Sequence, residues 1–172
     1  MASHNGLMEL SQLVADSSVS ERLSYVRVLL DLMEGREDVE QRALTGGAAI
    51  WLTAIDETLM DGNPEVRGTL YKDRRASEEG GRTIRGLRLA RNEIAHGSAL
   101  VTRNGVRFPA SFPWRFYLHF ISANELSAHN RLRRGSELRA FDLSLYEQHV
   151  AGQRPREVLA RGHDWLVEIT GV

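Results

Sequence analysis

The stretch Arg88-Leu89-Ala90-Arg91-Asn92-Glu93-Ile94-Ala95-His96-Gly97 decides the fold prediction, because it places a cation within a helical apolar pattern. On a wheel of about 100° per residue, Arg91 falls on the apolar side of the helix, among Ile84, Leu87, Ala90, Ile94 and Ala95. Arginine is essentially never deprotonated, so beside apolar surroundings it requires an anionic partner. Two interpretations follow: a structural ion pair, with Asp56 or Glu57 on the preceding helix as candidate partners, or a bound phosphate.

A second set of polar residues lies apart from Arg91 on the same predicted helix. Its members are spaced by three, four and four positions and form one stripe: Arg85, Arg88, Asn92 and His96. The structural interpretation of His96 is a residue that complements the negative end of the helix dipole, with Gly97 as the left-handed terminator. The functional interpretation is a polar surface that meets a ligand.

The composition predicts one globular domain over residues 1–172. Of the 172 residues, 42% are hydrophobic and 26% are charged, and the formal net charge is −1. With so small a net charge, any anion site must be local. The chain has no cysteine, which excludes disulfides, thiolate metal sites and cysteine nucleophiles. The N-terminal residues lack a signal-peptide pattern and no long apolar run occurs, so we expect a cytoplasmic protein with no membrane partner.

The apolar periodicity predicts a mostly α-helical bundle with a small β-hairpin after the motif helix. Asn104-Gly105 is the turn signal of that hairpin, and residues 72–81 are interpreted as a charged linker. Residues 112–121 fit either a strand or the start of a buried helix. Helices are predicted over residues 7–14, 18–35, 38–60, 65–71, 82–96, 136–150 and 155–170.

The hexapeptide Arg91-Asn92-Glu93-Ile94-Ala95-His96 resembles the signature of the HEPN superfamily (higher eukaryotes and prokaryotes nucleotide-binding), in its RNxxxH form. The resemblance implies a HEPN-like helical domain that acts as a metal-independent endoribonuclease without a cofactor. It implies a homodimer in which the two motifs meet across the interface. The motif is also similar to that of toxins from toxin–antitoxin and phage-defence systems, so an antitoxin protein is a candidate partner. Ser98 departs from members that carry a tyrosine two residues after the histidine, which weakens the case for an adenylylating antitoxin.

The motif residues suit RNA cleavage by attack of the 2′-hydroxyl on the adjacent phosphate. His96 would transfer protons and Arg91 would stabilise the charge on the phosphate, while Asn92 would orient the histidine or the RNA. Arg88 and Arg85 are candidate substrate-binding residues. On a helix, Arg91 and His96 point about 140° apart. Either the arginine bends toward the helix end, or the partner subunit completes each site.

Two other classes of function remain open on the sequence. The same fold could be a non-catalytic RNA-binding or oligomerisation module, or a structural helical adaptor. Other features are weaker signals. His163-Asp164 resembles part of a metal site but lacks further ligands. A basic cluster is more typical of a solvated loop than of an RNA track: Arg131, Arg133 and Arg134.

Overall fold

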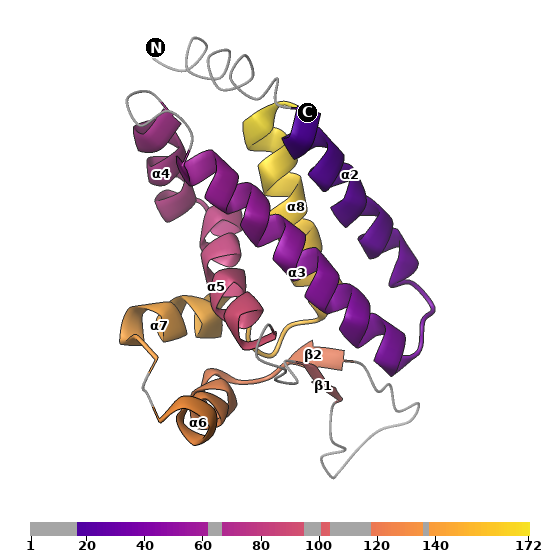
Figure 1. Cartoon of the computed structure of the whole chain (residues 1–172), viewed down its shortest axis with the longest axis vertical. Helices are drawn as coiled ribbons and strands as arrows, with labels where there is room; N and C mark the ends of the chain where they lie inside the picture. Colours follow the sequence, from indigo (N-terminus) through magenta and orange to yellow (C-terminus); the bar gives the residue numbers. More distant parts are fainter. Residues whose placement is uncertain (1–16, 62–66, 95–100, 104–117, 136–137) are drawn as a thin grey trace.

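The computed structural model describes residues 17–61, 67–94, 101–103, 118–135 and 138–172. This part of the chain is mostly helical and contains one small antiparallel sheet (Figure 1), which confirms the predicted mostly α class. The helices are α2 (Ser17–Leu32), α3 (Asp38–Asp61), α4 (Arg67–Ser77), α5 (Glu79–Ile94), α6 (Ala123–Arg134), α7 (Ala140–His149) and α8 (Pro155–Thr170), and the strands are β1 (Val101–Arg103) and β2 (Leu118–Phe120). The predicted helix over residues 7–14 lies outside the described residues.

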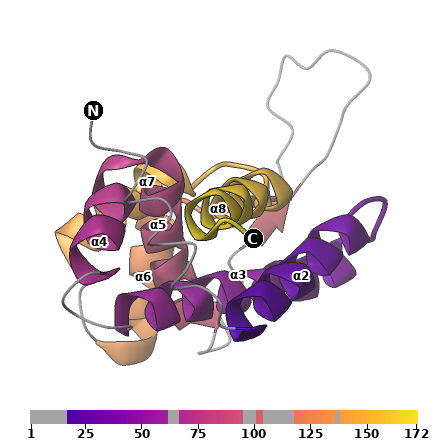
Figure 2. The ribbon, with the colours of Figure 1, turned by 90° about the horizontal axis from the view of Figure 1, so that it is seen from above.

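The helices α2 and α3 lie side by side and form one wall of the core (Figures 1 and 2). The chain reverses between them at Gly35, whose φ of +70° favours glycine. Both helices bury most of their apolar residues against the core, including Val26 and Leu52, which are fully buried. Val39 differs, because it is 79% exposed at the start of α3.

The helix α5, which carries the opening stretch as far as Ile94, is packed on several sides within the chain. It contacts α3, α4, α7 and α8, and Figure 2 shows α8 beside it on the side toward α2. Its apolar residues Ile84, Leu87 and Ala90 are fully buried in this packing. The part of the apolar face of α5 that these three residues form is therefore occupied within the chain and is not free for a symmetry-related copy.

The interpretation of residues 72–81 as a linker is wrong. The segment forms the end of α4 and the start of α5, separated by Glu78 alone. A side chain at Gly80 would overlap Trp165 of α8, and one at Gly81 would overlap the backbone of Arg75. These glycines permit close packing of α5 against α8 and α4.

The helix α6 was not predicted, although its ends carry clear signals. Ser122 forms a capping box with Glu125, and Gly135 ends the helix in the left-handed conformation. Arg131 therefore lies in the last turns of a helix and not in a loop. The helix α7 begins at Ala140, after the predicted start at residue 136, whereas α8 begins with Pro155 as predicted.

The small sheet pairs β1 with β2 in antiparallel register, with Val101 opposite Phe120. Of the two interpretations of residues 112–121, the strand is thus confirmed for Leu118–Phe120. The predicted small β-hairpin after the motif helix is confirmed as this two-stranded antiparallel pair, while the turn signal Asn104-Gly105 lies outside the described residues. Phe120 also exchanges backbone hydrogen bonds with Gly152 and Gln153, which ties β2 to the turn between α7 and α8.

Candidate functional site

Arg91 forms an ion pair with Glu57 of α3. Its Nη1 atom lies 2.9 Å from Oε2 of Glu57, and Nη2 of Arg88 lies 3.6 Å from the other carboxylate oxygen. The side chains of Arg91 and Glu57 are 26% and 35% exposed, so the pair is only partly shielded from water. The cation on the apolar side of α5 therefore has an internal carboxylate partner, one of the two that the sequence offered.

Asp56, the other candidate, has a fully buried side chain and is engaged in a separate cluster. It accepts two hydrogen bonds from Arg75, at 2.5 and 2.7 Å, and one from the hydroxyl of Tyr71 at 2.7 Å. Burial and the adjacent carboxylate together raise the pKa of Tyr71 well above its usual range. Because these contacts join α3 to α4, Asp56 fixes the position from which Glu57 meets α5.

The polar stripe of α5 faces a cavity of about 510 Å³ between α5 and the segment that begins α7. We call this cavity the arginine pocket. Its lining residues come from two stretches of the chain: Arg85, Arg88, Leu89, Asn92, Leu138, Arg139 and Asp142. Three of the four predicted stripe residues are among them, and the fourth, His96, lies outside the described residues.

Close packing of α7 on α5 places the two walls of the arginine pocket. A side chain at Gly86 would come within 2.8 Å of Val150 and 3.2 Å of the carbonyl oxygen of Leu145, so only glycine permits this approach. Near the start of α7, the guanidinium carbon of Arg85 lies 4.7 Å from the centre of the Phe141 ring. This cation–π contact holds the guanidinium group of Arg85 beside the cavity.

The lining of the arginine pocket carries three arginines and one carboxylate, that of Asp142. Burial and the nearby Arg75 cation lower the pKa of Arg85, while Asp142 and Asp56 raise it. Arginine nevertheless stays charged at neutral pH. With more cations than carboxylates, and an exposed Asn92 at its edge, the pocket is suited to an anion with several oxygen acceptors, such as a phosphate group.

The structure thus separates the site residues expected from the motif. Asn92 lines the arginine pocket together with the substrate-binding candidates Arg85 and Arg88, whereas Arg91 points to Glu57. Sequence reasoning missed Arg139, Asp142 and Phe141. In the sequence these residues were marked only by the start of a predicted helix. Their proximity to α5 depends on how α7 packs, which no local pattern shows.

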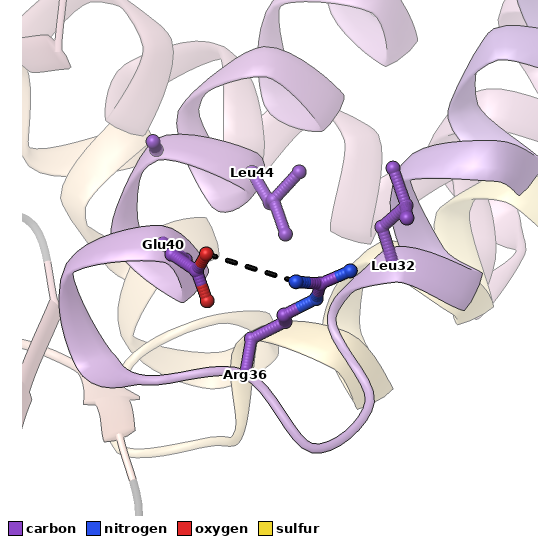
Figure 3. A pocket seen from close by; sticks show the side chains of 5 residues that line it. Leu32, Arg36, Glu40 and Leu44 are labelled. Atoms are coloured by element: carbon purple, nitrogen blue, oxygen red, sulfur yellow. Dashed lines mark ion pairs between the residues drawn. The ribbon is translucent and has the colours of Figure 1, made fainter.

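A second cavity, of about 320 Å³, lies where α2 and α3 meet (Figure 3). It is lined by Leu32, Arg36, Glu40, Ala43 and Leu44. The guanidinium of Arg36 points toward Glu40, 3.7 Å away. This cavity offers a single cation, whereas three arginines line the arginine pocket, so it is a weaker anion site than the arginine pocket.

The described residues hold no group of three or more metal-ligating side chains. His163 instead contacts its neighbour Asp164, with Nδ1 2.9 Å from Oδ1, on the helix α8. Within the part of the chain that the structure describes, no helix is long and apolar enough to span a membrane.

Comparison with protein-family models, with curated proteins and with solved structures finds no match to this chain. The arginine pocket is consequently interpreted from its own chemistry.

Proposed function

We propose that this chain is a metal-independent endoribonuclease of the HEPN type and that the arginine pocket binds a phosphate of the RNA substrate. One observation carries the proposal: Arg85, Arg88 and Asn92, three residues of the predicted stripe, line one pocket together with Arg139. In a regular helix the stripe continues to His96, which is four residues after Asn92. The proposal therefore puts a proton-transfer group next to a phosphate-binding pocket.

The proposed reaction is the attack of a ribose 2′-hydroxyl on its adjacent phosphate. His96 takes the proton of the 2′-hydroxyl as this oxygen bonds to phosphorus, and the bond from phosphorus to the 5′-oxygen breaks. The leaving 5′-oxygen takes a proton from water and the proton on His96 returns to solvent, so the products carry 2′,3′-cyclic phosphate and 5′-hydroxyl ends. Arg88 and Arg85 stabilise the charge on the phosphate oxygens, and Asn92 orients the histidine or the RNA. Arg91, the cation of the motif, reaches a phosphate only by leaving Glu57.

The ion pair between Arg91 and Glu57 favours a second candidate, a non-catalytic module that binds RNA in the same pocket. In this alternative Arg91 joins α5 to α3, and the pocket binds phosphate without cleaving the chain. The two candidates share the ligand and differ only in whether His96 does chemistry.

The proposal includes a role as a cytoplasmic toxin or phage-defence effector, with an antitoxin protein as partner. It also includes a homodimer that brings two motifs together. The dimer contact must use residues other than Ile84, Leu87 and Ala90, which are buried within the protomer. Sedimentation at micromolar concentration tests this part, and a monomer there contradicts the dimer.

The deciding experiment compares RNA cleavage by the wild type and by His96→Ala, with His129→Ala on α6 as the matched control. Loss of a well-placed acid–base group lowers a rate by about 10²–10⁴. We expect that loss for His96→Ala alone, undiminished activity in EDTA, and no cleavage of RNA methylated at the 2′-oxygen. Binding without cleavage by the wild type would favour the non-catalytic module, and equal cleavage by the wild type and His96→Ala would refute the assignment of His96.

A further inference from the structure

Phe141 is exposed at the rim of the arginine pocket. It lies in the first turn of α7, between the lining residues Arg139 and Asp142, and it is 58% exposed. A single exposed apolar side chain is common on protein surfaces and needs no explanation by itself. Phe141 differs from such a residue because its ring contacts Arg85, one of the three arginines that line the pocket.

Among the described residues, the ring of Phe141 has a partner in Arg85. The guanidinium of Arg85 lies over the ring, with the carbon atom 4.7 Å from the ring centre. Since Phe141 stays 58% exposed in this arrangement, much of its side chain is open to water. An aromatic surface next to positively charged groups is the combination with which proteins bind single-stranded nucleic acids, because bases stack on the ring while the cations contact the backbone.

We propose that Phe141 is a stacking platform for an unpaired base whose neighbouring phosphate lies in the arginine pocket. This inference rests on the proposed RNA-binding function and specifies its substrate as single-stranded at this point. In a duplex, each base is stacked and paired inside the helix, so its face is not available to the ring. Recognition by stacking is also tolerant of base identity, because every base has a π-face.

Phe141 could alternatively act only by holding Arg85 in place for the phosphate. The two roles differ in their dependence on the base. If Phe141 stacks a base, its loss weakens the binding of RNA with that base and leaves the binding of an abasic RNA unchanged. If it only positions Arg85, its loss weakens the binding of both RNAs by the same factor.

The experiment measures the affinity of the full chain for a 2′-O-methyl hexanucleotide, which binds without being cleaved, and for the same strand with one abasic position at each site in turn. Stacking on an aromatic residue contributes about 1–3 kcal/mol per base, which is roughly 5- to 150-fold in affinity. We expect the wild type to lose this factor at one abasic position. Phe141→Leu should bind the intact strand as weakly as the wild type binds that abasic strand, whereas Phe141→Trp should retain the preference.

Leu132→Ala is the matched control, because Leu132 is 85% exposed on α6 and does not line the pocket. Equal weakening of the intact and the abasic strands by Phe141→Leu, or no weakening, would overturn the role of Phe141 and leave the proposed function intact. A wild type that binds none of the strands would overturn the proposed function and this inference with it. Equal affinity of the wild type for the strand and for its duplex would overturn the single-stranded specificity.

Discussion

The buried cluster around Asp56 predicts a large and selective loss of stability when Arg75 is replaced by methionine. The side chain of Asp56 is 0% exposed and that of Arg75 is 11% exposed, and two hydrogen bonds join them. Arg75→Met keeps much of the side-chain volume but leaves the carboxylate buried without its cation. Breaking a buried pair by removing one partner costs about 3–5 kcal/mol.

This cost is a large share of the roughly 5–15 kcal/mol by which a native protein is stable. In a chain of this size each kcal/mol changes the melting temperature by about 2–4 °C, so Arg75→Met should melt roughly 6–20 °C below the wild type. Urea unfolding followed by circular dichroism measures the free energy directly. The same substitution at Arg36 is the control, because that arginine and its partner Glu40 are about half exposed, at 47% and 53%. Arg36→Met should cost less than about 1 kcal/mol.

A double variant separates the unpaired charge from the lost packing. Asp56→Asn removes the charge and keeps an acceptor for the hydroxyl of Tyr71. Asp56→Asn combined with Arg75→Met should therefore be more stable than Arg75→Met alone. If Arg75→Met costs no more than Arg36→Met, or if the double variant is no more stable than Arg75→Met, the argument from a buried and unpaired carboxylate is wrong.

Three further predictions concern single charged or titratable residues. Arg88→Gln should reduce the salt dependence of RNA binding, with the slope of log affinity against log salt smaller by about 0.7 in magnitude, and an unchanged slope would exclude a phosphate contact. Glu57→Gln should strengthen RNA binding because it frees Arg91 and removes a negative charge beside the arginine pocket, and weaker RNA binding would contradict this prediction. Because the ion pair is partly exposed, the substitution should lower the free energy of unfolding by no more than about 1 kcal/mol. Burial and the Arg82 cation lower the pKa of His149; Arg161 adds to this effect and Glu79 opposes it. Because the unfolded state then binds more protons than the folded state, the free energy of unfolding falls as the pH drops through about 6.5. In urea unfolding at about pH 7 and pH 5, His149→Gln should lose less stability than the wild type, and an equal loss would refute the assignment.

The sequence predicted the helical class because long amphipathic segments such as α3 bury the residues that their periodicity selects. It failed where tertiary packing changes the meaning of a local signal. The composition of residues 72–81 is typical of a charged linker, although Gly80 and Gly81 at its end permit α5 to approach Trp165 and the backbone of Arg75. The missed helix α6 is a different error, since the capping box at Ser122 was present in the sequence.

The candidate site shows the same division between local and tertiary information. Periodicity alone predicted that Arg91 is separate from the stripe that contains Arg88 and Asn92. The structure agrees for Asn92, whereas Arg88 lines the arginine pocket and also lies 3.6 Å from Glu57, the partner of Arg91. Periodicity left two candidate partners for Arg91, Asp56 and Glu57. Neighbouring residues on a helix point about 100° apart, and the packing of α3 decides which of the two faces α5. No local pattern in the sequence indicated that α7 contributes residues to the pocket.

The packing of α5 also determines which substitutions can test the site. In the second half of the helix as described, Arg88 and Asn92 are exposed and both line the arginine pocket, whereas the residues around them are buried or partly buried. A rigid, packed helix holds such groups with little freedom, which favours a preorganised site. Arg91 serves the packing through Glu57, so a loss of activity in Arg91→Ala has two explanations, a lost catalytic group or a displaced helix. If Asn92→Ala loses activity while its melting temperature is unchanged, the only explanation is the loss of a functional group. Full activity in both Asn92→Ala and Arg88→Gln would refute the assignment of the arginine pocket as the RNA site.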